Sequence, residues 1–348
     1  MDLSIVIVSW NVKEKLRECL RSVEETTPPP SSSPIKGEEI IGNSPPSVGG
    51  ARGGGSLTYE VFVVDNASKD GTVQMVEQEF PSVHVIANDF NAGFAKANNQ
   101  AIRLSQGRYV LLLNPDMRVF QGTLEGMVRF MDDPVNAKVG VAGCWLVSPI
   151  HNPPPPSLTL REGDRAVPPL RVRGGRGSYE IDDYVTVPHV RRFPTIKDQL
   201  AIMLKVPHFF PKVLDHYMMQ DFDYSKEARV DSIRGSFFMI RRELLDKIGM
   251  LDEGFFIWFE EVDFCKRAIE AGYEVAYTPT VKAVDYVGQS FKQVRLYPKQ
   301  KMMTRSMVQY FRKHRPWWEG ELLDWVRPLA LAAVWVGDKL NMQGKRVT

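Results

Sequence analysis

The stretch RYVLLLNPD, Arg108–Asp116, decides which fold class the sequence predicts. Its apolar run Tyr109–Leu113 is short and bounded by polar residues and proline, which is typical of a strand buried on both faces of a parallel sheet. Pro115 cannot continue the hydrogen-bonded ladder, so the chain should leave the sheet there and present Asp116 at the carboxyl end of the strand. Open α/β sheets bind their ligands at that edge. The stretch therefore predicts a buried strand and a carboxylate that faces a ligand.

Strand and helix patterns alternate on both sides of this stretch. Apolar runs at Leu3–Trp10, Tyr59–Val64, Val83–Ala87 and Val139–Val147 predict further strands, and helical periodicity occurs between them. This alternation predicts an α/β fold with a Rossmann-like, mostly parallel sheet flanked by helices. Asn11 followed by Glu14 resembles a capping box at the start of the first helix. The later predictions are a helical region over 196–217, a strand over 235–241, a helix over 262–271 and a strand over 273–277.

Two segments have a composition that does not suit a folded core. Residues 28–56 are mostly proline, glycine and serine, and cannot bury enough apolar surface to offset the entropy lost on ordering, so we expect a disordered insertion. Residues 149–180 are a second Pro/Gly/Arg-rich stretch, expected to be a loop. We divide the rest into a main domain over 1–295 and a helical, aromatic C-terminal extension over 296–348, broken at Pro316 and Pro328.

Composition and charge exclude several classes of protein. The formal net charge of the 348 residues is +2, which gives no reason to expect a nucleic acid as partner. The three cysteines lack CxxC spacing, which argues against a disulfide framework and a structural zinc site, and fits a reducing cytosol. The N-terminus lacks a basic signal-peptide region, and no apolar run reaches the roughly 20 residues that span a bilayer. We therefore expect a cytoplasmic protein.

Polar residues collect where the predicted strands end. Asp65 ends a buried strand, where its carboxylate could cap a turn or could hydrogen-bond a nucleotide base or ribose. Asn91, Asn98 and Asn99 lie near a predicted helix start, where asparagine commonly caps backbone groups. Asparagine is a poor helix former, so either of the two inside the predicted helix could instead contact a ligand.

Five further acids and their neighbours suggest chemistry. The run WFEEVD, Trp258–Asp263, could simply supply negative charge to a helix N-terminus, but aromatic surroundings also raise a carboxylate's pKa, as a general base requires. Asp116 could hold a hard divalent cation against a diphosphate. Asp285 follows the next strand and could be a second metal ligand or a surface acid. The sequence contains no P-loop, nucleophile elbow or HExxH motif.

Five motifs, in this order, resemble glycosyltransferase family 2, and within it a bacterial rhamnosyltransferase-like group. They are MDLSIVIVSWN, VFVVDNASKDGT, NAGFAKANNQAI, YVLLLNPDM and GSFFMIRRELLDKIGMLDEGFFIWFEEVDFCKRAIEAGYEV. The resemblance covers nearly the whole chain apart from residues 28–56, 149–180 and the far C-terminus. It implies a GT-A fold for residues 1–295, and an inverting transfer of a sugar from a nucleotide-diphosphate donor to a hydroxyl group.

The resemblance also implies roles for individual residues. Asp116 corresponds to the last acid of the family's DxD motif, a ligand of Mg²⁺ or Mn²⁺, and Asp285 stands where the family often has a metal-binding histidine. Glu261 falls at the position of the catalytic base, usually an aspartate, with Glu260 and Asp263 as substitutes. Contacts with the nucleotide or donor are implied for Ser9, Trp10, Asn11, Asp65, Asn66, Gly93, Phe94, Asn98 and Asn114, the last of which replaces the first acid of the DxD motif.

The resemblance further implies dTDP-rhamnose as donor, with UDP-sugars left open, and a surface polysaccharide or a polyprenyl-diphosphate-linked saccharide as acceptor. The basic and aromatic stretch Arg312–Trp318 and the apolar stretch Leu329–Val336 could contact the inner face of the cell membrane, or could pack on the domain's own core. Two alternatives stay open. A sugar-nucleotide pyrophosphorylase would need a basic Gly-rich loop after the first strand, which SWNVKEKL lacks, and a non-catalytic nucleotide-sugar-binding partner in polysaccharide assembly would differ only by its lack of turnover.

Overall fold

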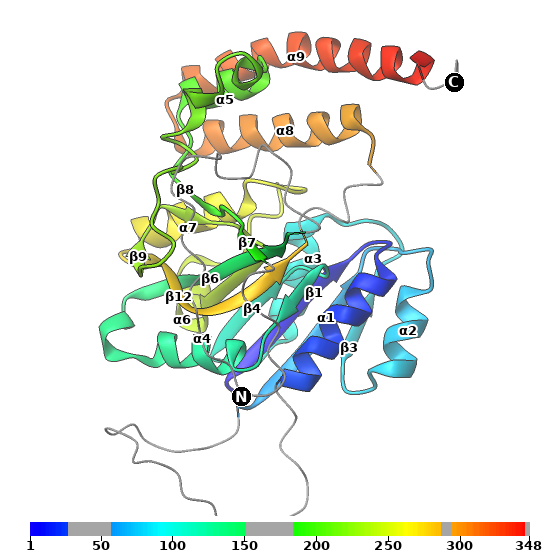
Figure 1. Ribbon diagram of the computed structural model, residues 1–348, viewed down its shortest axis with the longest axis vertical. Coiled ribbons are helices and arrows are strands. Elements are labelled where there is room, and N and C mark those ends of the chain that lie inside the picture. Colours follow the sequence, from blue (N-terminus) through cyan, green and yellow to red (C-terminus); the bar gives the residue numbers. More distant parts are fainter. Residues whose placement is uncertain (27–56, 151–183, 287–293, 345–348) are drawn as a thin grey trace, which may run out of the picture.

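The computed structural model describes residues 1–26, 57–150, 184–286 and 294–344, so the expected insertion at 28–56 and most of the expected loop at 149–180 lie outside the described residues (Figure 1). A ten-stranded sheet forms its centre, with the order β3-β2-β1-β4-β11-β6-β12-β5 along its main path. These strands are β1 (Leu3–Ser9), β2 (Tyr59–Asp65), β3 (His84–Ala87), β4 (Tyr109–Leu113), β5 (Met117–Val119), β6 (Val139–Pro149), β11 (Phe237–Arg241) and β12 (Glu274–Asp285). Short strands β7 (Tyr184–Thr186) and β9 (Ala228–Arg229) pair with β6 and β12, while β8 (Val190–Arg191) pairs with β10 (Ser232–Ile233).

Helices cover both faces of the sheet. The α-helices of the described residues are α1 (Lys13–Thr26), α2 (Thr72–Glu79), α3 (Phe94–Leu104), α4 (Thr123–Asp132), α5 (Ile196–Met203), α6 (Arg242–Ile248), α7 (Glu260–Glu270), α8 (Leu296–His314) and α9 (Trp317–Gly344), and six of them pack on the sheet. One hydrophobic cluster packs α1, α2 and α4 on one face, and a second packs α3, α6 and α7 on the other. The alternating side chains of β1 divide between these clusters: Ile5 belongs to the first and Val6 to the second. This arrangement confirms the predicted mostly parallel α/β sheet.

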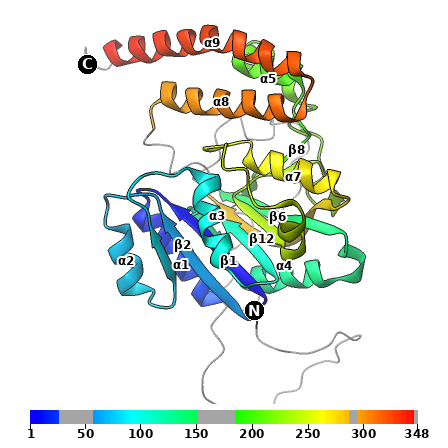
Figure 2. The ribbon, with the colours of Figure 1, turned by 180° about the vertical axis from the view of Figure 1, so that it is seen from behind.

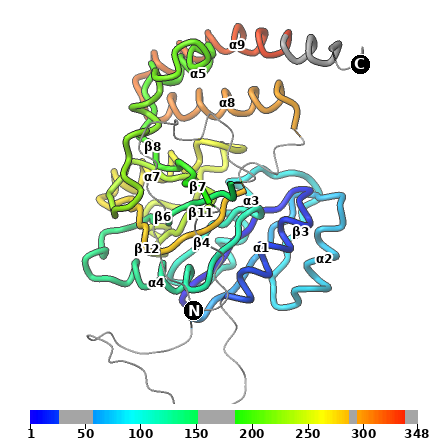
Figure 3. The backbone as a smooth tube through the Cα atoms, viewed as in Figure 1, coloured from blue at the N-terminus to red at the C-terminus, as the bar shows by residue number. Residues whose placement is uncertain are grey.

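Strand directions bring many chain segments to one edge of the sheet. β1, β2, β3 and β4 are parallel, and β2 and β4 lie on opposite sides of β1, so the strand order reverses there. Ligands of open α/β sheets bind at such a reversal, outside the carboxyl ends of the strands. β12 is parallel to β6, whereas β11 runs antiparallel to both β4 and β6, between which it lies in the strand order. Figure 3 labels these strands near one another at the centre of the molecule. Because of these directions, β11 and the antiparallel strand β5 begin at the edge where β1, β2, β4 and β12 end.

The C-terminal helices form a layer apart from the sheet. In Figures 1 and 2, α9 is outermost and α8 lies between it and the rest of the molecule. A third hydrophobic cluster joins Phe311 of α8 and Leu323 of α9 to Phe255 and Phe259, which precede α7. We propose the start of α8 as the beginning of the extension, because this cluster is separate from the two that cover the sheet.

The expected helix break at Pro328 was wrong. A proline at this position has no N–H to donate to the carbonyl four residues earlier, yet α9 continues through it. Packing on α8 accounts for the continuity, because Leu323 and Ala330, on either side of Pro328, are buried in the third cluster. The break at Pro316 was confirmed, since α8 ends at His314.

Two other local predictions were also wrong. The helical region expected over 196–217 contains only α5, followed by short 3₁₀ turns at Val206–His208 and Pro211–Leu214, each with proline in its first turn. Asn11 does not act as a cap for α1: the backbone N–H of Lys13 donates to Asp70 Oδ2 at 2.9 Å instead. The cap comes from a loop distant in sequence, so the local pattern could not reveal it.

Candidate active site

Buried polar atoms without a hydrogen-bond partner among the described residues gather at the carboxyl edge of the sheet. A buried donor or acceptor left unpaired costs about 1–3 kcal/mol, so native proteins keep few of them away from binding sites. This edge and the start of α7 hold Ser9 Oγ, Asp65 Oδ1, Asn98 Oδ1, Arg234 Nη1, Ser236 Oγ, Glu260 Oε2 and Glu261 Oε2. Their concentration marks the edge as a ligand site.

Asp65 uses its two carboxylate oxygens differently. Oδ2 accepts a hydrogen bond from the backbone N–H of Ser68 at 2.8 Å, which caps the turn after β2. Oδ1 is buried and has no partner among the described residues. Ser9 lies directly opposite Asp65 across the β1–β2 pair, and its Oγ is likewise buried without a hydrogen-bond partner among the described residues. The adjoining Trp10 is half-buried. Asp65 can therefore cap the turn with one carboxylate oxygen and contact a ligand with the other.

The loop before α3 is held against the loop before α7. The backbone N–H of Phe94 donates to the carbonyl oxygen of Phe256 at 2.7 Å. Gly93 has φ +84°, and a Cβ there would lie 2.5 Å from that same oxygen, so only glycine fits. The next turn of α3 presents Asn98, whose Nδ2 donates to the carbonyl of Phe94 while Oδ1 has no partner among the described residues.

Three asparagines use their side chains within the protein. Asn66 Nδ2 donates to the carbonyl of Gly93 at 3.2 Å, and its Oδ1 accepts two hydrogen bonds from the same loop. Asn11 Oδ1 accepts from the backbone N–H of Lys69 at 2.7 Å. Asn99 donates to and accepts from the backbone of Leu251. For the Asn11 and Asn66 side chains, these contacts favour a role in shaping the loops that carry other candidate residues over the expected contact with a ligand.

Asp116 and Asp285 lie at neighbouring positions across the β5–β12 pair. Asp285 is paired with Met117, and the backbone N–H of Tyr286 donates to the carbonyl of Asp116 at 3.3 Å. Both residues are almost completely buried. The described residues offer no group of three or more metal-ligating side chains, so the protein would supply two carboxylates. Mg²⁺ is commonly held by one or two carboxylates plus substrate phosphates and water, so this hard-oxygen pair fits such a cation. Asn114 anchors the turn by donating its N–H to the Ser236 carbonyl.

Glu260 and Glu261 begin helix α7, directly after two residues with a strained backbone. Trp258 and Phe259 have φ of 63° and 70°, left-handed values that cost non-glycine residues about 1–3 kcal/mol each and that cluster at functional sites. Burial, followed by the charge of Glu261, raises the pKa of Glu260 well above its usual value. Burial also raises the pKa of Glu261.

Two arginines that the sequence did not single out flank Glu261. The charges of Arg234 and Arg191 favour its ionised form and so oppose the effect of burial on its pKa. Arg234 Nη1 also lies 3.5 Å from Asp285 Oδ2. At Gly235, a Cβ would be 3.7 Å from Glu261 Cβ and 3.9 Å from a ring atom of Phe94, so both candidate residues lie beside this glycine, just before β11. The sequence does show an arginine, Arg234, next to this glycine. It lies at the ligand edge only because β11 runs antiparallel to β4, and the sequence alone does not reveal that direction.

Asp263 has a different environment. Its carboxylate contacts Arg267 at 2.8 Å, Lys313 at 2.7 Å and His314 Nε2 at 2.7 Å. Burial alone would raise the pKa of Asp263, but hydrogen bonds from His314 and Lys313 and the charge of Arg267 lower it to about 2. A carboxylate held by two cations and a histidine ring is a poor proton acceptor, so these contacts favour a structural role in fixing α8 to α7 over the expected substitute-base role.

Replacing Asp263 by asparagine should destabilise the fold by about 3 kcal/mol, because it removes the buried carboxylate that partly buried Arg267 and Lys313 both contact. The folded pKa is depressed, so the stabilisation should be present above the unfolded pKa, near 3.8, and disappear as the pH falls towards 2. Urea unfolding at pH 7 and pH 3 measures this. Asp223→Asn is the control, since its pKa is also lowered to about 2 but it is exposed. Equal effects of the two substitutions would contradict the structural role.

Residues 4–144 match the family model for Glycosyl transferase family 2. Among curated proteins, the chain is 25% identical over 244 residues to the N-acetylglucosaminyl-diphospho-decaprenol L-rhamnosyltransferase of Mycobacterium tuberculosis strain H37Rv, covering 66% of this chain and 67% of that protein. It is 28% identical over 236 residues to the rhamnosyltransferase WbbL of Escherichia coli K12, covering 66% and 73%. The matched family region contains Asp65 and Asp116, while both rhamnosyltransferase matches are longer than that region.

Among solved structures, GalNAc-T7 crystallised with UDP, GalNAc and Mn²⁺ superposes with a TM-score of 0.51 at 14% identity, covering 90% of this chain and 48% of that one. At this identity the likeness concerns the fold alone. It agrees with the expected GT-A arrangement of sheet and helices.

Proposed function

We propose that this chain, whose residues 4–144 match the model of glycosyltransferase family 2 and which is similar to rhamnosyltransferases, moves a sugar, with inversion, from a nucleotide diphosphate to an acceptor hydroxyl. The main support is the cluster of unpartnered buried polar atoms that extends from Asp65 and Ser9 to Glu261 at one edge of the sheet. Atoms of this kind are donors and acceptors prepared for a polar ligand such as a nucleotide sugar.

Glu261 is the proposed general base. Its Oε2 would take the proton of the acceptor hydroxyl while that oxygen attacks the anomeric carbon from the face opposite the diphosphate. The sugar–phosphate bond breaks as the new glycosidic bond forms, so a single displacement inverts the configuration and the nucleotide diphosphate departs. The raised pKa of Glu261 suits a base, because a carboxylate that binds protons more tightly removes one more effectively.

Asp116 and Asp285 are the proposed ligands of Mg²⁺ or Mn²⁺. Such an ion, when bound, neutralises charge that develops on the departing diphosphate. Arg234 lies beside Asp285 and its charge acts on Glu261, so its guanidinium would share that neutralisation and favour the ionised form of Glu261. Asp65 and Ser9 would contact the nucleoside, and Gly93, Phe94 and Asn98 would line the donor loop.

We propose dTDP-rhamnose as donor and a saccharide linked to a polyprenyl diphosphate as acceptor, within polysaccharide or cell-wall biosynthesis. The support is the mycobacterial relative, whose name states transfer of L-rhamnose to N-acetylglucosaminyl-diphospho-decaprenol. We further propose a cytoplasmic enzyme that contacts the inner face of the membrane carrying that acceptor. Among the described helices, none has the length and apolar character that a membrane span requires.

A calorimetric screen tests this function. The full chain is titrated with dTDP-rhamnose, UDP-sugars and GDP-sugars, each with Mn²⁺ and with chelator, and the donor that binds is then incubated with a polyprenyl-diphosphate-linked N-acetylglucosamine. We expect metal-stimulated binding of one donor and a product whose anomeric configuration, read by NMR, is inverted. Binding without any transfer would favour the non-catalytic sugar-nucleotide partner. Retention of configuration would exclude the single displacement.

Replacing Arg234 by glutamine should move the acidic limb of the kcat/KM–pH profile to higher pH. Loss of a neighbouring cation disfavours the ionised form of Glu261, so its pKa rises further and a higher pH is needed to deprotonate it. We also expect kcat/KM at neutral pH to fall roughly tenfold, because the guanidinium would no longer help to neutralise the charge that develops on the departing diphosphate. The matched control is Arg21→Gln, an exposed arginine on α1. An unmoved limb would show that Arg234 does not act through Glu261.

A further inference from the structure

An apolar stripe occupies the outer face of α9. Its positions are three, four or seven residues apart, which places them on one side of a helix. They are Trp318, Leu322, Trp325, Leu329 and Val336, with Trp325 80% exposed and Leu329 71% exposed. The residues on the other side, Leu323, Ala330 and Val334, are buried. A face with this much exposed tryptophan and leucine is uncommon on a protein surrounded by water alone and marks a contact surface.

Helices α8 and α9, which together form the α8–α9 hairpin, also carry an excess of positive charge. Residues 296–336 contain seven lysines and arginines against three acids, a formal charge of +4, whereas the whole chain carries only +2. A cavity of 640 Å³ between α8 and α9 is lined by Lys301, Arg305, Arg312, Lys313 and Arg327, with Asp324 as its acid. Arg312 and Lys313 pair with acids, but no acid of the described residues lies within ion-pair distance of Lys301 or Arg305. Part of the positive charge is therefore available to an anion.

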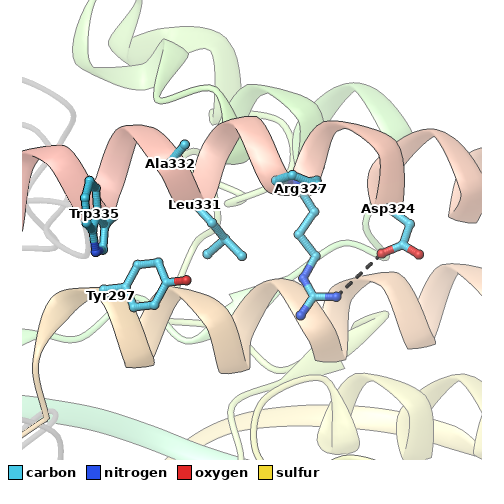
Figure 4. Close-up of a pocket in the computed structure, with 7 residues that line it drawn as sticks. Tyr297, Asp324, Arg327, Leu331, Ala332 and Trp335 are labelled. Carbon is cyan, nitrogen blue, oxygen red and sulfur yellow. Dashed lines mark hydrogen bonds and ion pairs between the residues drawn. The ribbon is translucent and has the colours of Figure 1, made fainter.

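An apolar cavity continues this basic one. It has a volume of 470 Å³ and is lined by Tyr297 on α8 and by Leu331 and Trp335 on α9. Figure 4 shows Tyr297 and Trp335 together at one end and the Arg327–Asp324 ion pair at the other. Arg327 and Asp324 line both cavities, so the two adjoin at this ion pair. The groove between α8 and α9 has an apolar half and a cationic half. It therefore complements a phosphate-bearing lipid, which has an apolar part and an anionic part.

We infer that the α8–α9 hairpin is a docking surface for an anionic lipid bilayer: the stripe on α9 enters the membrane interface, and the basic groove beside it binds lipid phosphates. Tryptophan prefers the interface between headgroups and acyl chains. Amphipathic helices lie in that plane with their apolar side immersed, and anionic lipids add about 1 kcal/mol per nearby lysine or arginine. The inference rests on the proposed function, because a lipid-linked acceptor would then meet the enzyme at the membrane.

Charge distinguishes a bilayer from a second copy of the chain as the occupant. Two hairpins packed stripe to stripe would bring two surfaces of charge +4 together, which self-repulsion disfavours. A negatively charged leaflet complements both the apolar stripe and the cations, which no like-charged copy does.

Vesicle co-sedimentation of the full chain tests this surface. We expect binding to vesicles of phosphatidylglycerol and phosphatidylcholine that weakens with salt, and far weaker binding to phosphatidylcholine alone. The double variant Trp325→Ser, Leu329→Ser should lose at least tenfold in partitioning, and should fold because both side chains are exposed. Lys301→Glu with Arg305→Glu should lose binding only to anionic vesicles. The matched controls are Phe90→Ser and Lys226→Glu, exposed residues remote in sequence from the hairpin.

The outcomes separate this surface from the proposed activity. Stripe variants should keep donor binding and transfer to a water-soluble acceptor analogue, but lose transfer to a lipid-linked acceptor in vesicles. The proposed docking surface would be wrong if the wild-type protein did not bind anionic vesicles, or if the stripe variants bound them as the wild type does. It would also be wrong if the only change in a stripe variant were from dimer to monomer in light scattering. Vesicle binding without any transfer would leave the surface intact and count against the proposed function alone.

Discussion

Replacing Glu261 by glutamine is expected to lower kcat by about 10²–10⁴-fold, the usual contribution of a positioned general base, while leaving donor affinity nearly unchanged. Glutamine keeps the shape of the side chain but cannot accept the acceptor's proton. Glu261 lies at the start of α7, next to the strained pair Trp258 and Phe259, so the loop that fixes its position does not depend on the carboxylate itself. Steady-state kinetics with the transferring donor, together with calorimetric donor binding, separate loss of chemistry from loss of binding.

Glu260→Gln is the matched control for this prediction. Burial and the charge of Glu261 raise the pKa of Glu260 far above its usual value, so its carboxyl group retains a proton and glutamine replaces it closely. We expect kcat to change by no more than about threefold, since no proton acceptor is lost. The reverse pattern, with activity lost in Glu260→Gln and kept in Glu261→Gln, would assign the base to Glu260.

Much of the sheet could be predicted from sequence because its strands are buried on both faces. Uninterrupted apolar runs such as Ile5–Val8 and Tyr109–Leu113 leave little choice of structure, and the polar residues that end them must then meet at one edge. Asp65 and Asp116 could therefore be predicted as edge carboxylates from the amino-acid sequence alone.

The direction of β11 could not be predicted, and it determines which other residues join that edge. Its sequence, like that of a parallel strand, is a short apolar run, so composition does not reveal that it runs antiparallel between β4 and β6. If β11 were parallel to β4, Arg234 would lie at the opposite edge. The contacts of Asn66 and Asp263 could not be predicted for a different reason: their partners lie 27 and 51 residues away, at Gly93 and His314, where no local pattern extends.

Replacing Asp116 by asparagine should abolish the metal-stimulated part of donor binding and lower kcat/KM by about 10²–10³-fold, because a metal's stabilisation of a leaving diphosphate is worth several kcal/mol. Asp116 is nearly fully buried beside the β5–β12 pair, where it would be one of only two protein carboxylates near the ion among the residues that the structure describes. Asparagine preserves the volume, so the fold should persist. Electron paramagnetic resonance of Mn²⁺, with and without the nucleoside diphosphate, measures metal binding independently of turnover.

Asp285→Asn discriminates between the two carboxylates. The Asp285 carboxylate lies 3.5 Å from Arg234 Nη1, so removing its charge weakens the metal site but releases the guanidinium towards the diphosphate. We therefore expect Asp285→Asn to weaken Mn²⁺ binding while keeping more donor affinity in chelator than Asp116→Asn does. If Asp116→Asn bound Mn²⁺ and donor as the wild type does, the DxD correspondence of Asp116 would be wrong. If the two variants instead lost metal and donor equally, Arg234 would have no part in holding the diphosphate, and the ion would be its principal counter-charge.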